Sequence, residues 1–143
     1  MPPRQKPRET SSRPPIAITA VVDAVGALAG DTVHDHLYLY DTNKAGGSTG
    51  FGTEQLRTKV RAGDRVVWNV LALECEAFVG IADIVVDKDV IEPERQTYPG
   101  TDVAYWIGTV KKDDIGQVPY QIKFLVGTRT IPITTTLSPT LVG

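Results

Sequence analysis

The stretch VRAGDRVVWNVLAL, residues 60–73, decides the fold, because a charged Gly-Asp turn leads directly into an apolar strand with Trp68 near its middle. Residues 65–73 are apolar on both faces, as is typical of a strand inside a sheet and not at its edge. The stretch therefore predicts the central strand of a β-sheet domain, and the rest of the chain supplies its neighbours.

Further strands are predicted wherever short apolar or alternating runs stand between turn residues. These runs cover residues 16–25, 32–40, 54–61, 77–86, 103–110, 120–126 and 130–137. Pro132 places the last run at a sheet edge. Residues 26–31 are predicted to be a turn, and no segment favours a helix longer than one turn. Seven or eight strands at this spacing predict an all-β fold, a single antiparallel β-sandwich of immunoglobulin-like or jelly-roll-like type over residues 16–143.

Length and cysteine content restrict the class of protein. A chain of 143 residues can bury the core of one domain without disulfides or metal ions. Its one cysteine, Cys75, cannot form an intrachain disulfide and fits a reducing compartment. No apolar segment follows the basic N-terminus, and no run approaches the roughly 18 apolar residues of a membrane span. We therefore expect a soluble cytoplasmic protein with no membrane partner.

Residues 1–15 predict an extended arm, because they contain five prolines and no apolar residue after Met1. The arm is basic, while the remaining residues include 11 basic and 16 acidic side chains. Such an arm can be a solvated tail, can reach over another copy of the protein, or can bind nucleic acid. Nucleic acid is an unfavoured partner, because its binding usually needs a broader basic face. The candidate assembly residues in the arm are Arg4, Lys6, Arg8 and Arg13.

A second candidate site combines the predicted strand 32–40 with the loop that follows it. The strand would present two histidines and two tyrosines on one face, and the loop, residues 41–53, contains four glycines and would be long and mobile. Aromatic faces beside a polar loop are surfaces on which sugars stack. The candidate ligand-binding residues are His34, His36, Tyr38, Tyr40, Asp41, Asn43 and Phe51.

The spacing of residues gives little support to metal binding, phosphate binding or a reactive cysteine. His34 and His36 would lie about 6.6 Å apart along a strand, but nothing supplies the remaining ligands of a metal site, so exposed histidines or a subunit contact are favoured. The glycine-rich loop lacks the lysine of a phosphate-binding loop. Cys75 lies between two glutamates, which disfavour a reactive thiolate. We expect no catalytic residues, no metal and no cofactor.

Two family resemblances bear on this interpretation. The pattern V-x-A-G-D-x-V-x-W is similar to a strand opening in cupredoxins, but a copper site needs histidine and cysteine late in the chain, and here both histidines come early. The chain also resembles the AidA and PixA inclusion-body family of bacterial β-sandwich proteins. The residues that carry this resemblance are 37–40, Gly63, Asp64, Val66, Trp68 and 120–126.

The second resemblance implies an intracellular bacterial protein that self-associates and has no established catalytic residues. The proline-rich arm is not part of the family's pattern. We therefore expect a non-enzymatic protein that forms homo-oligomers or larger assemblies, with its arm reaching a neighbouring subunit. The alternative is a small-ligand or carbohydrate-binding module that uses loop 41–53.

Overall fold

The computed structural model describes residues 13–143, so Arg4, Lys6 and Arg8 lie outside the described residues. The described chain forms eleven strands, one α-helix and one 3-10 helix. In chain order these are β1 (Ile16–Val22), α1 (Ala24–Gly30), β2 (Leu37–Asp41), η1 (Lys44–Gly46), β3 (Arg57–Lys59), β4 (Arg65–Ala72), β5 (Val79–Val85), β6 (Glu94–Thr97), β7 (Ala104–Thr109), β8 (Gln117–Pro119), β9 (Gln121–Val126), β10 (Ile133–Thr134) and β11 (Thr140–Val142).

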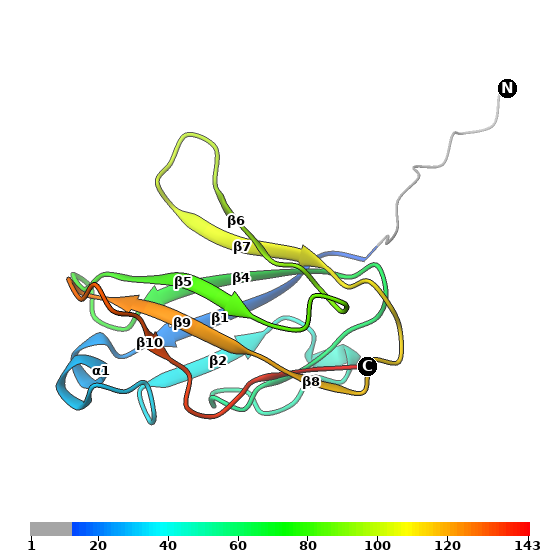
Figure 1. Cartoon of the computed structure of the whole chain (residues 1–143), viewed down its shortest axis with the longest axis horizontal. Coiled ribbons are helices and arrows are strands. Elements are labelled where there is room, and N and C mark those ends of the chain that lie inside the picture. Colours follow the sequence, from blue (N-terminus) through cyan, green and yellow to red (C-terminus); the bar gives the residue numbers. More distant parts are fainter. Residues whose placement is uncertain (1–12) are drawn as a thin grey trace, which may run out of the picture.

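The strands form three sheets, with the orders β2-β1-β4-β7-β6, β10-β9-β5 and β3-β11-β8. The first two face each other across the core, and the third closes one end (Figure 1). The all-β class is thus confirmed, but the predicted single antiparallel sandwich of seven or eight strands is not what is seen. β1 runs parallel to β4, and β3 runs parallel to β11. Parallel neighbours need a long crossover connection, and the chain between β1 and β4 makes one through β2 and β3.

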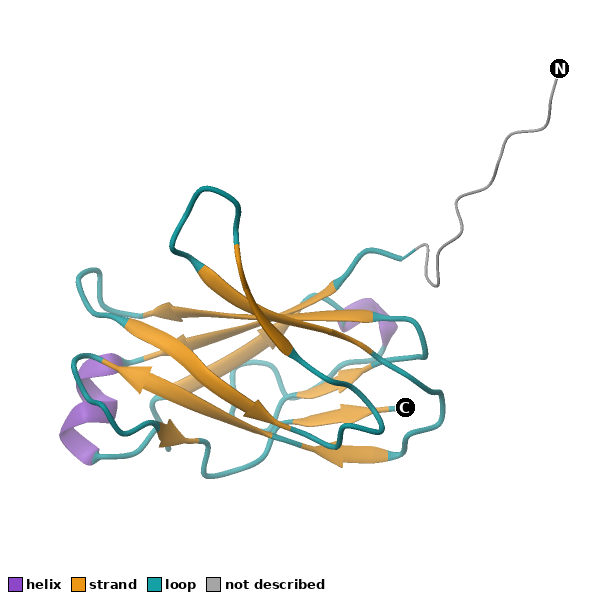
Figure 2. Ribbon diagram, turned by 45° about the horizontal axis from the view of Figure 1, so that its top comes forward, coloured by secondary structure: helices purple, strands orange, loops and turns teal. Residues whose placement is uncertain are grey.

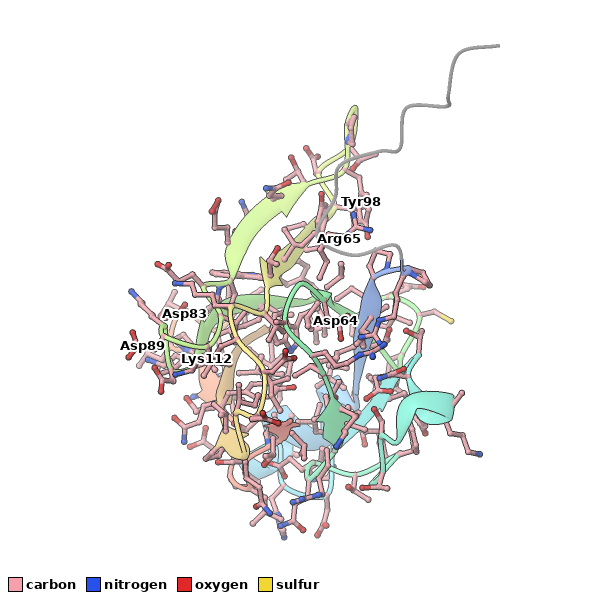
Figure 3. The ribbon with its side chains drawn as sticks, turned by 90° about the vertical axis from the view of Figure 1, so that its right-hand side faces the viewer. Asp64, Arg65, Asp83, Asp89, Tyr98 and Lys112 are labelled. Atoms are coloured by element: carbon pink, nitrogen blue, oxygen red, sulfur yellow. The ribbon has the colours of Figure 1, made fainter. Side chains whose placement is uncertain are left out.

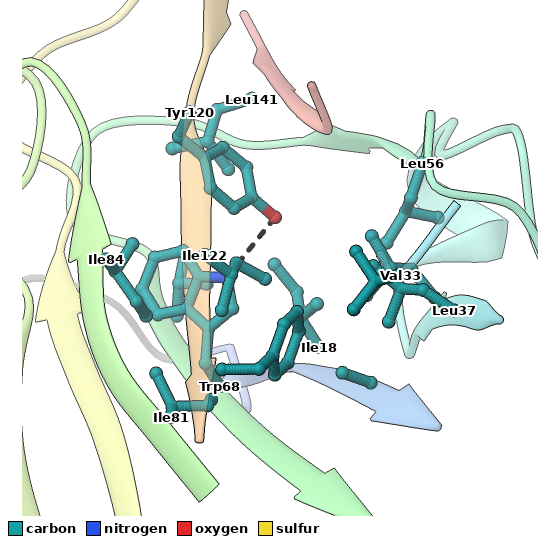
Figure 4. Close-up of a cluster of buried hydrophobic side chains, with 14 of the residues drawn as sticks. Ile18, Val33, Leu37, Leu56, Trp68, Ile81, Ile84, Tyr120, Ile122 and Leu141 are labelled. Carbon is teal, nitrogen blue, oxygen red and sulfur yellow. Dashed lines mark hydrogen bonds between the residues drawn. The ribbon is translucent and has the colours of Figure 1, made fainter. Parts of the chain in front are cut away.

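β4 lies inside the five-stranded sheet, as predicted, with β1 on one side and β7 on the other. Its inward side chain Trp68 is 1% exposed and meets Tyr120 edge to face, with ring centroids 5.7 Å apart. The Trp68 indole N–H donates to the Tyr120 hydroxyl at 3.2 Å (Figure 4). Burial raises the pKa of Tyr120, so this hydroxyl stays protonated. The two rings join β4 to the residue between β8 and β9.

The predicted strand over residues 16–25 is too long, because the chain turns into helix α1 after Val22. The Asp23 side chain caps the helix by accepting the Gly26 N–H at 3.0 Å. Asp31 ends the helix in the left-handed region, with φ of 54°. Residues 26–31, predicted as a turn, therefore belong largely to the helix. This helix packs near β9 at one end of the molecule (Figure 1).

Other element boundaries also differ from the predicted ones. β2 begins only at Leu37, and the preceding residues form a turn that includes Asp35 at φ of 64°. Residues 87–101, between two predicted strands, contain β6, which pairs with β7 in a hairpin whose loop end projects from the molecule (Figure 2). β11 was not predicted. β10 does lie at a sheet edge, as Pro132 indicated.

Candidate functional site

The root of the arm is held by an ion pair between Arg13 and Asp64. Asp64 belongs to the Gly-Asp turn before β4 and is 3% exposed (Figure 3). The Arg13 Nε donates to Asp64 Oδ1 at 3.0 Å, and a terminal guanidinium nitrogen donates to Oδ2. The Arg61 N–H also donates to Oδ2, at 2.9 Å. A buried carboxylate needs such partners, because its desolvation would otherwise be costly.

This ion pair joins the arm to the domain core. Val110 N–H donates to the Asp64 carbonyl at 2.8 Å, so the turn is itself bonded to the end of β7. Arg13 is the one candidate arm residue among the described residues, and its side chain is 34% exposed. Arg13 and Asp64 therefore hold the first described residue of the chain against the domain.

Two of the predicted ligand residues, His34 and Tyr38, line a surface cleft of about 350 Å³. Glu54 forms its polar wall together with Thr53 and Gln55, and Leu137 adds an apolar one. The Tyr38 hydroxyl lies 3.5 Å from the Asp35 carbonyl oxygen. The cleft therefore combines one tyrosine, one histidine and two carboxylates, Asp35 and Glu54, within a space that a small polar molecule could fill.

Glu54, which the sequence analysis did not single out, is 5% exposed and accepts several hydrogen bonds from one segment. The Leu137 N–H donates to its carboxylate at 2.9 Å, and the Thr136 hydroxyl donates at 3.0 Å. The Thr136 N–H is a further donor. His34 Nδ1 lies 3.9 Å from this carboxylate. With its oxygens occupied in this way, Glu54 holds residues 136–137 in place.

The prediction that His34 and His36 share one strand face is wrong, because the strand starts after both of them. His36 points the other way, toward the start of α1, with Nδ1 3.5 Å from the Asp23 carboxylate. The His36 N–H closes the turn by donating to the Val33 carbonyl at 2.9 Å. The two imidazoles thus have different neighbours and do not converge on one ligand.

The glycine-rich segment 41–53, predicted as a loop without regular structure, contains the 3-10 helix η1 and isolated bridges to Leu39 and Arg57. Asp41 accepts the Asn43 N–H at 2.8 Å and the Thr58 hydroxyl at 2.7 Å. Asn43 Nδ2 donates to the Lys59 carbonyl at 2.7 Å. Phe51 is partly buried against the core, and so is not a freely exposed contact residue. Asp41, Asn43 and Phe51 therefore hold the loop together.

Tyr40 is the most exposed of the predicted ligand residues in β2, at 46%. A Cβ atom on Gly52 would lie 3.4 Å from its hydroxyl, so the ring lies over the backbone of the loop. It does not line the cleft that contains His34 and Tyr38. The structure thus brings together only part of the predicted site.

Within residues 13–143, no group of three or more histidine, cysteine, aspartate or glutamate side chains is arranged to hold a metal ion. Cys75 is a free, exposed thiol. In the same part of the chain, no helix has the length and apolar character that a membrane crossing requires.

Comparisons with known proteins give a family and a fold. The family described as "Domain of unknown function (DUF8788)" matches residues 14–131. No curated protein matches the chain. Among solved structures, the inclusion body protein PixA from Burkholderia cenocepacia is similar with a TM-score of 0.66 and 12% sequence identity, over 92% of this chain and 96% of that chain. The resemblance to PixA inclusion body proteins is thereby confirmed at the level of the fold. Since the family match spans most of its length, the chain belongs to the DUF8788 family.

Proposed function

We propose that this protein is a non-enzymatic assembly protein of the cytoplasm, in which copies associate and the N-terminal arm of one copy contacts a neighbouring subunit. An inclusion body protein shares its fold, and this likeness supports a structural role. The free, exposed thiol of Cys75 fits the reducing conditions of a cytoplasm.

The observation that carries the proposal is the ion pair between Arg13 and the buried Asp64. It holds the root of the arm against the rigid start of β4, while residues 1–12 contain only one apolar residue, Met1, with which to pack on their own domain. An arm with a fixed root and no apolar anchor is suited to reaching another molecule. The positive charge of the arm is also opposite in sign to the net negative charge of the rest of the chain.

The mass of the protein in solution tests this proposal. We would compare the full chain with a chain lacking residues 1–12, which keeps the bond between Arg13 and Asp64. A matched full-length variant would carry Arg4→Ser, Lys6→Ser and Arg8→Ser. We expect the full chain to form oligomers and both altered chains to have lower average mass at equal melting temperature. A full chain that stays monomeric at the highest attainable concentration would refute self-assembly.

A second candidate function is the binding of a small ligand or carbohydrate. The observation that favours it is the cleft of about 350 Å³ in which His34 and Tyr38 lie beside Glu54. Loop 41–53 would contribute to it through Gly52 and Thr53. A glycan array together with a thermal-shift screen of sugars, with and without Ca²⁺, tests this function. Binding that is lost in Tyr38→Ala and kept in Tyr40→Ala would support it, and a flat response of the unaltered chain would remove it.

A further inference from the structure

Most of the outer strands of the three sheets are protected against pairing with another chain. The outer edge of β2 is covered by its own loop, since Gly52 N–H donates to the Leu39 carbonyl at 2.7 Å and Leu39 N–H donates to the Thr53 carbonyl at 3.3 Å. β3 is covered in the same way by Thr49, which exchanges hydrogen bonds of 2.9 and 2.8 Å with Arg57. Both edges therefore have few free backbone groups to offer.

Three other edge strands are protected by their shape or sequence. β8 has three residues and ends in Pro119, and β10 has two residues and follows Pro132. β5 carries an irregularity in register between Ile81 and Asp83, where the Trp106 indole donates to the Ile81 carbonyl at 3.2 Å. Short strands, prolines, bulges and edge charges all hinder edge-to-edge pairing.

β6 is flanked by Pro93 and Pro99 and carries Glu94 and Arg95, but no other described segment bonds to its outer edge. It is the last strand of the five-stranded sheet, its register with β7 is uninterrupted, and its four residues are all exposed. The loop end of the hairpin projects from the molecule (Figure 2), while Glu94 and Arg95 at its base border grooves that β5 also lines. An edge of this kind is a template for another strand.

The hydrogen-bond pattern shows which backbone groups of β6 are free. Tyr98 N–H donates to the Val103 carbonyl at 3.0 Å, so the backbone of Tyr98 faces β7. Because an antiparallel ladder alternates, Gln96 and Glu94 also face β7, while Arg95 and Thr97 direct their N–H and carbonyl groups outward. A partner strand must bond to Arg95 and Thr97.

A second copy of β6 can bond to this edge in one favourable register. If Arg95 faced Arg95 across a twofold axis, two guanidinium groups would be opposed and Thr97 would face Pro93, which has no N–H. If Thr97 faced Thr97, Arg95 would face Pro99, with the same loss. With Gln96 on the axis, Arg95 of each copy faces Thr97 of the other copy. No like charges are then opposed, and both Arg95–Thr97 pairs can form all of their backbone hydrogen bonds.

We propose that β6 pairs antiparallel with β6 of a second copy of this chain about a twofold axis at Gln96, joining two five-stranded sheets. This contact rests on the proposed self-assembly and specifies one of its surfaces. The arm is a poorer occupant, because Pro2, Pro3 and Pro7 interrupt it and cannot donate to a ladder. The net charge of the edge itself is zero, with Glu94 and Arg95, so two copies can approach without strong repulsion.

The apolar groove beside β6 agrees with this partner. Phe78, Val103 and Trp106 line a groove of about 350 Å³ that Arg95 also borders. Phe78 and Val103 are each 58% exposed. Arg95 and Thr97 project toward this face of the sheet, so the paired strand brings Thr97 of the second copy to the mouth of the groove. Pairing would thus reduce the exposure of the apolar lining.

Cysteine scanning in the full chain tests the register. In a Cys75→Ser background, Gln96→Cys, Arg95→Cys and Thr97→Cys would each be oxidised and run on a non-reducing gel. Gln96 would form a non-hydrogen-bonded pair with its equivalent, with Cα atoms about 4.5 Å apart, within the range of a disulfide. Equivalent cysteines at 95 or 97 would be offset by two residues and lie beyond about 7 Å. We expect several-fold more covalent dimer from Gln96→Cys. A maximum at 95 or 97, or no dimer above the background chain, would overturn the proposal.

Proline at position 97 provides a second test. Thr97→Pro removes an N–H that points away from β7, so the hairpin keeps its internal bonds. Combined with Gln96→Cys it should abolish the crosslink, while Thr97→Ala should keep it. Equal crosslinking by the two would contradict the proposal, and the cysteine scan decides the matter if the proline variant does not fold.

The same measurements separate this inference from the proposed function. Oligomers that form without a crosslink at 96 would leave self-assembly standing and remove the β6 contact. A crosslink at 96 in a chain whose mass is indifferent to Arg4→Ser, Lys6→Ser and Arg8→Ser would support the β6 contact and remove the role of the arm.

Discussion

Two buried polar pairs connect distant parts of the chain, Trp68 with Tyr120 and Arg13 with Asp64. In each pair one partner is almost fully buried, so its polar atoms depend on the other for hydrogen bonds. The loss of one partner from such a pair costs more than the bond itself contributes, because a desolvated group remains without a partner. Substitutions at these four positions therefore report on how the sheets and the arm are held.

Tyr120→Phe should destabilise the domain by about 1–2 kcal/mol, because it leaves the buried Trp68 N–H without its acceptor. The ring and most of its packing are kept, so the change isolates the hydrogen bond. Urea unfolding followed by tryptophan fluorescence measures it, with Tyr98→Phe on the exposed hairpin as the control. A Tyr120→Phe chain as stable as the unaltered one would show that the bond contributes nothing.

Arg13→Met should also destabilise the domain, by about 1–3 kcal/mol, although Arg13 is itself only partly buried. The cost arises at Asp64, because its carboxylate stays buried. Among the described residues, the backbone N–H of Arg61 is then its remaining hydrogen-bond donor. In the background of Asp64→Asn, which carries no charge, the same arginine substitution should cost much less. A double-mutant cycle measures this difference, and a coupling energy near zero would mean that the pair does not anchor the arm.

At the scale of elements, the sequence predicted strands best where the apolar pattern is clear. The run that contains β4 is apolar on both faces, the run that contains β9 alternates, and the inward residues of both strands pack in the core. Helix α1 was missed because AVGALAG has no charged face and only Asp23 marks its start. The site was only partly predictable, since its cleft depends on Glu54 meeting Thr136, 82 residues away, and no local pattern encodes such a contact.

The start of α1 should respond to acid. The pKa of Asp23 is lowered by its hydrogen bond with Glu74, by the Gly26 N–H and by the charge of His36. A lowered carboxyl pKa stabilises the folded state above the usual value of about 4, and this stabilisation is lost as pH falls through the lowered value. Asp23→Asn should therefore reduce Tm near neutral pH, and the difference from the unaltered chain should shrink in strong acid. Melting curves between about pH 2 and pH 7 test this, with Asp102→Asn as the exposed control, and a difference that stays constant with pH would contradict it.

The whole molecule combines two proposed contacts of different kinds. Pairing of β6 strands uses one surface twice and closes a dimer, whereas an arm that reaches a neighbour joins two different surfaces and can continue into larger assemblies. The arm contact would rest on exposed charges, which salt screens, and the β6 contact on backbone hydrogen bonds and apolar burial, which salt does not weaken.

High salt should therefore reduce the full chain to dimers but not to monomers. At about 0.5 M NaCl the Debye length falls below about 8 Å, so the attraction of the arm for the acidic domain is largely lost. Sedimentation velocity at low and high salt measures the species present. Thr97→Pro should shift the high-salt species from dimer to monomer, while Thr97→Ala should leave it unchanged. Assemblies that keep their size in high salt would show that the arm does not join subunits through charge.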